Sequence, residues 1–553
     1  MAAKRKRKIK TRKFVEIPEG AFRVLAVLSV LWACFWLAGL SNACPEPAGA
    51  YYSIALEWFC LFALPVGIGL SGAVSSMISL RLERGSVASA RRVVSTAVFA
   101  GFLAGLASGL ALFFCSGFLM KAVLGNSDAA FVLQGFAPAL PFLFPLLALA
   151  GGLDGFGGSR AFSLVKAVFF LLVAAAGSAM AGRMSEYGQK VGALLQNDQY
   201  GPAYGALGGA LSVALAAVLA FFVALIAWWR MQPDLSLLQW GDERVEKRGQ
   251  LLAGLVKKLL PVLSVALILT VAALGEVLLF FGVSAGNSSR TGTELLSEWA
   301  LCAGRACALL LIPVIGAVAF AARISPELKV GFVRRNLKKS RDKCMIALRC
   351  AAVFAAPFAV IAAVLAHPLF LAFFREGDAS AGAALLRAGS ACVLFYSLAA
   401  MLGSILLSAE KPALLAGGVL AAAALHLAAL YGMLVLTDAG VAAVVYANLI
   451  LSAALCAILA ALVQKKLRLR LNWIRILLAP CISGGIMAAI CAVFAFLVLR
   501  SAPSPVTAGV SALAGLIFYF VCIVTLKGVT QRELRSFPAG GFFLALAKLV
   551  RLM

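Results

Sequence analysis

Long apolar stretches follow one another along this chain from Phe22 to Leu526, separated by short polar segments. A helix needs about 20 apolar residues to cross the hydrocarbon core of a bilayer, and these stretches reach that length. They are too long and unbroken for barrel strands, so we expect an all-α integral membrane protein. The pattern predicts fourteen transmembrane helices, at residues 22–40, 51–80, 93–120, 129–152, 161–182, 204–229, 259–283, 297–322, 344–370, 382–408, 413–436, 441–463, 474–499 and 506–526.

Composition supports this interpretation. Hydrophobic residues make up 63% of the 553 residues and charged residues 13%. Soluble domains have roughly 45–50% and about 25%. No water-soluble core needs so large an apolar fraction, so almost the whole chain is expected to lie in the membrane.

The net charge of +26 could indicate a nucleic-acid partner, but its distribution indicates a membrane topology instead. With the N-terminus inside, the cytoplasmic segments hold 37 of the 49 Lys and Arg residues, the outer segments hold six and the spans six. This asymmetry is typical of the positive-inside rule. We therefore expect both termini in the cytoplasm, anionic membrane lipids as partners of the basic loops, and no nucleic acid.

The two halves of the chain resemble each other. Pro65 in the second predicted span corresponds to Pro313 in the eighth, and each is followed by small residues and a basic loop. Two six-helix halves of equal topology are parallel repeats, which predicts a central cavity between them and bends at the two prolines. The expected organisation is a basic cytoplasmic tail, an N-terminal lobe, a cytoplasmic linker, a C-terminal lobe, two extra helices and an interfacial tail, at residues 1–21, 22–229, 230–258, 259–463, 464–526 and 527–553.

Motifs of soluble enzymes do not fit this setting. The run Gly67-Ile-Gly69-Leu-Ser-Gly72 matches a dinucleotide fingerprint as text, but it lies within a predicted span, where close helix packing or a bend is the better interpretation. Ser163 and Lys166 have the spacing of an acyl-transfer pair without its companion motifs. Only two histidines are present, and no Cys or His spacing indicates a metal site. We expect neither an enzyme nor a cofactor.

Charged residues inside spans are the remaining functional candidates, because burying one at the centre of a membrane helix costs at least about 3 kcal/mol. Arg305 lies about eight residues into its span, and Glu276 in the seventh span should reach a similar depth. Glu57 lies about two turns into the second span. These three are the candidate cavity residues.

The sequence resembles the MOP flippase superfamily, which includes the MATE multidrug transporters, the lipid II flippase MurJ and exporters related to stage V sporulation protein B. The likeness rests on the two halves, on Leu64-Pro65-Val66-Gly67 leading into Ser79–Gly85, and on Leu311-Ile312-Pro313 leading into Ile324-Ser325-Pro326. The two extra C-terminal helices are similar to those of MurJ and the sporulation-type exporters. The arginine pattern of MurJ's second helix is absent, so its arginines have no counterparts here.

The resemblance implies alternating access in a bacterial cytoplasmic membrane, with a polyprenyl-diphosphate-linked saccharide as cargo and the last two helices as a groove for the lipid tail. We expect a monomer. One alternative is a cation-coupled exporter of the MATE type, with Glu57 or Glu276 as its ion site. Another is a non-transporting scaffold of envelope assembly.

The repeat also relates two of the candidate residues. Glu57 stands eight residues before Pro65, and Arg305 stands eight residues before Pro313. The two are therefore expected to be symmetry mates of opposite charge that face the cavity from its outer half. Arg305 would bind a diphosphate when it separates from Glu57. Glu276 is the alternative partner, and a static ion pair is the competing interpretation.

Overall fold

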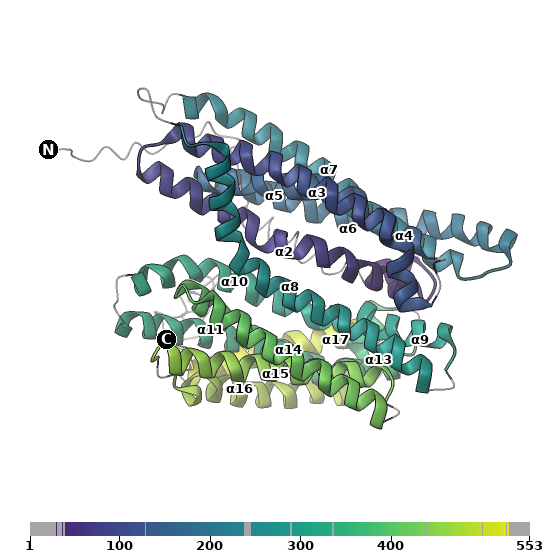
Figure 1. Cartoon of the computed structure of the whole chain (residues 1–553). Coiled ribbons are helices and arrows are strands. Elements are labelled where there is room, and N and C mark those ends of the chain that lie inside the picture. The colour runs from purple at the N-terminus through teal and green to yellow at the C-terminus, as the bar shows by residue number, and fades with distance from the viewer. Residues whose placement is uncertain are drawn as a thin grey trace. The chain divides into compact units, whose positions relative to one another are not determined.

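The computed structural model describes residues 29, 36, 39–125, 127, 129–236, 245–287, 290–333, 337–375, 377–437, 439–469, 471–499, 502–526 and 528–529. This part of the chain is helical and contains no strand. It divides into two compact units, Met1–Leu274 and Gly275–Met553 (Figure 1). The expectation of an all-α membrane protein is confirmed.

The helices of the first unit follow the predicted spans. They are α2 (Ala48–Glu83), α3 (Val87–Leu124), α4 (Ala130–Phe136), α5 (Leu140–Gly155), α6 (Ser159–Leu195), α7 (Tyr200–Ser236) and the first part of α8 (Arg248–Asn287). A 3-10 segment, Ala137–Ala139, separates α4 from α5 within the predicted fourth span. Pro138 lies in this segment and Pro141 follows it, and proline removes the backbone donors that a continuous helix needs.

The second unit begins with the remainder of α8. The elements that follow are α9 (Gly292–Trp299), the π-helix η2 (Ala300–Ala306), α10 (Cys307–Val333), α11 (Leu337–Val364), α12 (Ala366–Phe373), α13 (Ala379–Ser408), α14 (Pro412–Leu436), α15 (Val441–Lys466), α16 (Trp473–Val493), the π-helix η3 (Phe494–Val498) and α17 (Ser504–Thr525).

Thirteen helices of the described residues are long and apolar enough to cross a membrane, and they correspond to the second through fourteenth predicted spans. The first predicted span, 22–40, lies outside the described residues except for Ser29, Trp36, Gly39 and Leu40. Several helices run past the predicted bounds: the span predicted at 161–182 is the helix α6, Ser159–Leu195. Hydropathy marks only the apolar part of a helix, whereas backbone hydrogen bonding continues beyond it.

The predicted ninth span, 344–370, is interrupted. α11 ends at Val364 and α12 begins at Ala366. Pro368 occupies the first turn of α12, where its missing N–H is not needed, but the same residue could not continue α11 without breaking its hydrogen bonds.

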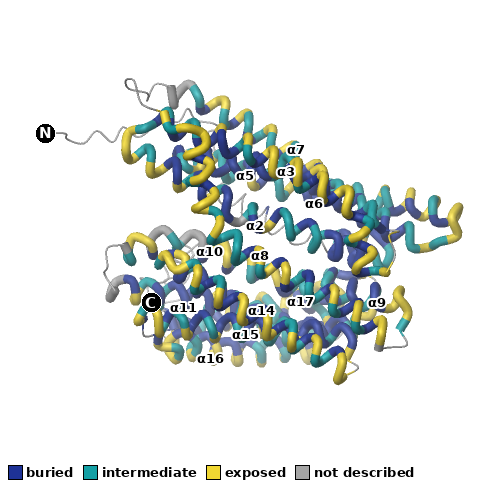
Figure 2. Tube along the Cα trace, in the orientation of Figure 1, coloured by how far each residue is buried: buried dark blue, intermediate teal, exposed yellow. Residues whose placement is uncertain are grey.

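Each unit is packed around its own core (Figure 2). In the first unit, Val74, Ile78, Val94 and Leu153 bring α2, α3 and α5 together, with Leu251 of α8 in the same cluster. Gly69 of α2 is one of the predicted packing glycines, and a Cβ there would lie 2.5 Å from Leu259 Cδ1 of α8. The outer face of α3 is apolar and exposed, which is normal for a surface that lipid covers; its exposed side chains include Phe99, Leu103, Leu110, Phe114 and Phe118.

Candidate functional site

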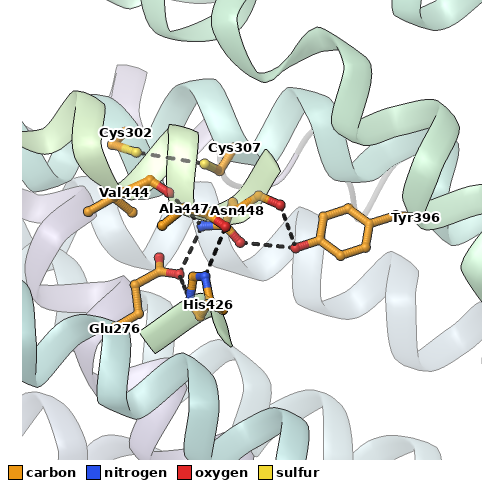
Figure 3. A network of polar contacts seen from close by, with 8 residues as sticks. All are labelled: Glu276, Cys302, Cys307, Tyr396, His426, Val444, Ala447 and Asn448. Carbon is orange, nitrogen blue, oxygen red and sulfur yellow. Dashed lines mark hydrogen bonds and ion pairs between the residues drawn. The ribbon is translucent and has the colours of Figure 1, made fainter. Parts of the chain in front are cut away.

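A polar cluster lies among four apolar helices of the second unit (Figure 3). Its centre is Glu276 of α8. Gly275 allows α8 to approach α14 closely, because a Cβ at this position would lie 3.0 Å from Leu427 Cδ2. The missing side chain thus brings the next residue, Glu276, within reach of α14.

His426 of α14 is the partner of Glu276. Its Nε2 lies 3.1 Å from Glu276 Oε2, and the side chains are 1% and 15% exposed. The other ring nitrogen, Nδ1, lies 3.0 Å from the carbonyl oxygen of Ala447 in α15. A carbonyl oxygen only accepts hydrogen bonds, so Nδ1 carries a hydrogen and donates it. The imidazole therefore faces Glu276 with Nε2 in a fixed orientation.

Two further side chains hold Glu276 from α15 and α13. Asn448 Nδ2 donates to Glu276 Oε2 at 2.8 Å and to the Val444 carbonyl at 3.1 Å. The hydroxyl of Tyr396 donates to Asn448 Oδ1 at 3.0 Å. Because both hydrogens of the amide are used on one side and its oxygen on the other, the direction of this chain of hydrogen bonds is fixed, from Tyr396 through Asn448 to Glu276.

Aromatic and thiol groups surround the polar cluster. One turn further along α8, the ring centroids of Phe280 and Phe281 lie 5.3 and 5.8 Å from the ring centroid of Trp299. The thiols of Cys302 and Cys307 lie 3.7 Å apart in the adjacent π-helix and its C-cap (Figure 3). A low local dielectric strengthens the interactions of a charged group in such surroundings and raises the cost of leaving that group unpaired.

Solved structures with a similar fold are membrane transporters. A structure described as the lipid II flippase MurJ in an inward closed conformation matches with a TM-score of 0.58 and 14% identity, over 91% of this chain and 98% of that chain. A multidrug resistance MATE family transporter of the MOP superfamily, in an inward-facing conformation, matches with a TM-score of 0.56 and 15% identity, over 80% and 94%. The eukaryotic MATE transporter AtDTX14 matches with a TM-score of 0.57 and 15% identity, over 82% and 94%.

The chain has the same fold as these transporters. No protein-family model and no curated protein sequence matches it, so the likeness is one of structure. The fold resemblance expected from the sequence is confirmed.

The three predicted cavity residues occupy different places in this fold. Glu276 is the centre of the cluster in the second unit. Arg305 lies in η2 and is 2% exposed, with its guanidinium carbon 5.6 Å from the centroid of the Phe374 ring. Glu57 lies half-buried in α2 of the first unit. The proposed pairing of Glu57 with Arg305 stays a prediction.

The two prolines predicted to bend helices are found inside long helices. Pro65 lies within α2 and Pro313 within α10. The helices continue on both sides of each proline, so neither residue ends its helix. Bending at these positions stays a prediction.

The sequence did not point to His426, Asn448 or Tyr396. The two histidines of the chain form no metal-binding spacing, and the amide and phenol carry no charge that would distinguish them in an apolar span. A signal was nonetheless present: His426 and Asn448 interrupt two consecutive apolar helices, α14 and α15. Polar side chains in such helices usually hydrogen-bond across to a neighbouring helix.

Proposed function

We propose that this chain is a transporter that flips a polyprenyl-diphosphate-linked saccharide across a bacterial cytoplasmic membrane by alternating access. The observation that carries this proposal is the likeness to the lipid II flippase, which covers 91% of the chain, against 80% and 82% for the two MATE transporters. The lipid II flippase structure thus matches more of this chain than either MATE structure does, which favours a lipid-linked cargo over a soluble drug.

An apolar groove beside α16 supports a lipid tail as part of the cargo. It has a volume of about 350 Å³ and lies between α13, α15 and α16. Its lining includes Leu394, Phe395, Leu398, Cys456, Trp473 and Leu477. An isoprenoid chain is a flexible hydrocarbon, and such a groove would shield part of it from the lipid while the head group crosses.

α16, which lines this groove, and α17, which follows it, both pack against other helices of the second unit. The hydroxyl of Tyr519 in α17 donates to the carbonyl oxygen of Val353 in α11 at 2.9 Å. Met487 and Cys491 of α16 are buried in one hydrophobic cluster together with Leu365, which lies between α11 and α12. We therefore propose that α16 and α17 move with the second unit during transport.

Arg305 is the proposed ligand of the diphosphate. Its guanidinium lies over Phe374 and is buried, so the ring must move aside before the two phosphates can be bound in the planar geometry that suits arginine. Transport and membrane abundance of Glu57→Gln, Arg305→Gln and the exchanged pair Glu57→Arg/Arg305→Glu test this role. A static pair predicts that the exchange restores both quantities, whereas a phosphate ligand predicts normal abundance without transport.

Depletion of the protein followed by lipid profiling tests the proposed cargo. We expect a polyprenyl-linked saccharide to accumulate, because its synthesis on the cytoplasmic side continues while its removal stops.

Hypersensitivity to drugs without such accumulation would contradict the proposal and favour the MATE-type exporter, for which the buried Glu276 cluster is the specific supporting observation. Normal growth of strains that lack every intramembrane charge would favour a scaffold.

A further inference from the structure

We propose that Cys302 and Cys307 form a reversible disulfide, that only the π-helical form of η2 permits this bond, and that the bond fixes the segment that carries Arg305. The formation of the bond does not depend on what the protein transports. Its effect on transport rests on the proposed function, in which Arg305 binds the diphosphate of the cargo.

The backbone of η2 brings the two thiols together. Their sulfur atoms lie 3.7 Å apart (Figure 3). The backbone N–H of Cys307 donates to the carbonyl oxygen of Cys302, five residues earlier, and this hydrogen bond is the one that defines a π-helix. One turn of the helix therefore closes between the two cysteines, so their side chains leave it on the same side.

A regular α-helix would keep the same two residues apart. At 1.5 Å per residue, five residues extend about 7.5 Å along the helix axis. A disulfide requires Cα atoms that are no more than about 7 Å apart. The π-helical turn is therefore a condition for the bond, and the bond in turn prevents a return to α-helical geometry.

The oxidant in this proposal is a small, uncharged hydroperoxide, which can enter apolar surroundings. Cys307 is half-buried and Cys302 is buried, so Cys307 is the thiol that the oxidant reaches first. Its sulfur, as the thiolate, attacks hydrogen peroxide, the O–O bond breaks, and a sulfenic acid and one water result. The sulfur of Cys302 then attacks the sulfur of Cys307, whose hydroxyl group leaves as a second water. In total the two thiols lose two protons and two electrons, and one peroxide becomes two waters.

The disulfide closes a ring of backbone around Arg305. This residue stands two positions before Cys307, and its guanidinium carbon lies 5.6 Å from the centroid of the Phe374 ring. The proposed function requires Arg305 and Phe374 to separate before the diphosphate binds. Since the bond fixes the backbone on both sides of Arg305, it opposes that separation and should stop transport.

A tryptic digest tests the bond without any cargo. Trypsin cleaves after Arg305, so the reduced chain yields Cys302 and Cys307 in separate peptides, 291–305 and 306–323. The full chain in nanodiscs is treated with hydrogen peroxide, its free thiols are alkylated, and the denatured protein is digested without reductant. We expect mass spectrometry to find the two peptides linked, and a phosphine reductant to separate them. Cys307→Ala should give no link.

The chain provides a matched control pair in a regular α-helix. Cys344 and Cys350 of α11 are both buried and stand six residues apart, about 9 Å along the helix axis. Arg349 lies between them, so the same digest separates their peptides as well. This pair should stay unlinked. No link between Cys302 and Cys307, or an equal yield from the control pair, would overturn the proposal.

Transport of a fluorescent polyprenyl-diphosphate saccharide in proteoliposomes tests the effect of the bond. The peroxide-treated protein should lose most of its transport and regain it on reduction, whereas Cys302→Ala/Cys307→Ala should keep its own untreated rate. Full transport by the bridged protein would overturn the restraint on Arg305. If the bond forms but the reduced protein moves no lipid-linked saccharide, the proposed function fails and the disulfide stands.

Discussion

At the scale of single residues, the direction of each hydrogen bond determines what the cluster around Glu276 can do. The bond from Tyr396 fixes the orientation of the Asn448 amide, and that amide in turn presents a donor to the carboxylate. Without Tyr396, the amide oxygen and nitrogen could exchange places. Tyr396 is therefore a positioning residue that acts on Glu276 through Asn448.

Tyr396→Phe leaves the amide oxygen of Asn448 unsatisfied in an apolar setting, which costs about 1–3 kcal/mol. We expect this cost to raise the barrier to transport and to lower the transport rate about tenfold. Membrane abundance should stay close to that of the wild type. Tyr519→Phe is the matched control, since its hydroxyl donates to a carbonyl oxygen, that of Val353 at 2.9 Å, far along the chain from Glu276. Equal effects of both variants on the transport rate would refute the positioning role.

Close helix contacts depend on individual glycines. A Cβ on Gly151 of α5 would lie 2.4 Å from the carbonyl oxygen of Ser71 in α2, whereas one on Gly117 of α3 meets nothing within 4 Å. We expect Gly151→Ala to destabilise the protein by about 1–3 kcal/mol, because backbone cannot yield as a side chain can. Gly117→Ala should be neutral or slightly stabilising. Thermal unfolding in detergent measures both, and equal melting temperatures would contradict the contact.

Residue patterns could predict part of the site. Glu276 is a carboxylate deep in an apolar span, so its cost in lipid marks it from sequence alone. Its partners come from α14 and α15, about 150 and 170 residues later, and no local pattern encodes that meeting. The burial of Arg305 against Phe374 depends likewise on the return of α12 toward η2.

At the scale of elements, arginines at the end of α2 and the start of α3 hold both ends of the linker between α7 and α8. Arg81 forms an ion pair with Glu246 at 2.6 Å, and Arg92 donates to the Glu246 carbonyl at 3.2 Å. Arg91 donates to Gln232 in α7. The basic segment between α2 and α3 therefore fixes the start of α8 against these two helices within the first unit.

Glu246→Gln removes the partly buried ion pair with Arg81, which contributes about 1 kcal/mol. The segment should then open to protease more often, so tryptic cleavage at Lys247 and Arg248 should be about fivefold faster. The side chains of Arg81 and Glu246 are 14% and 38% exposed. The control is Glu410→Gln, which removes the more exposed pair of Lys329 and Glu410 and should leave this cleavage unchanged. An unchanged rate in Glu246→Gln would mean that the pair does not restrain the linker.

Element boundaries were predictable where hydropathy defines them and not where backbone geometry does. The span predicted at 441–463 corresponds to the helix Val441–Lys466, because apolar residues fill it from end to end. The π-helix Ala300–Ala306 left no trace in the sequence, since it arises from a changed hydrogen-bond pattern within an apolar run.

At the scale of the whole molecule, the distribution of basic residues makes a prediction about topology. Reporter fusions after Arg92, Asn197, Lys339, Asp438 and Met553 should read in, out, in, out and in. The physical reason is that Lys and Arg near the ends of spans remain in the cytoplasm. An external C-terminus would contradict an even number of spans and therefore the predicted fourteen.

The central claim, that this chain flips a lipid-linked saccharide, is tested most directly by reconstitution. The purified protein is placed in liposomes that contain a fluorescent polyprenyl-diphosphate saccharide, and a membrane-impermeant quencher reports which leaflet holds it. The account predicts protein-dependent movement of the fluorescent lipid by the full chain, and none by a chain truncated after Leu469 that retains its remaining helices. Movement at the same rate by the truncated chain would contradict the role of α16 and α17. No movement by the full chain, together with export of a soluble cationic drug, would contradict the claim itself.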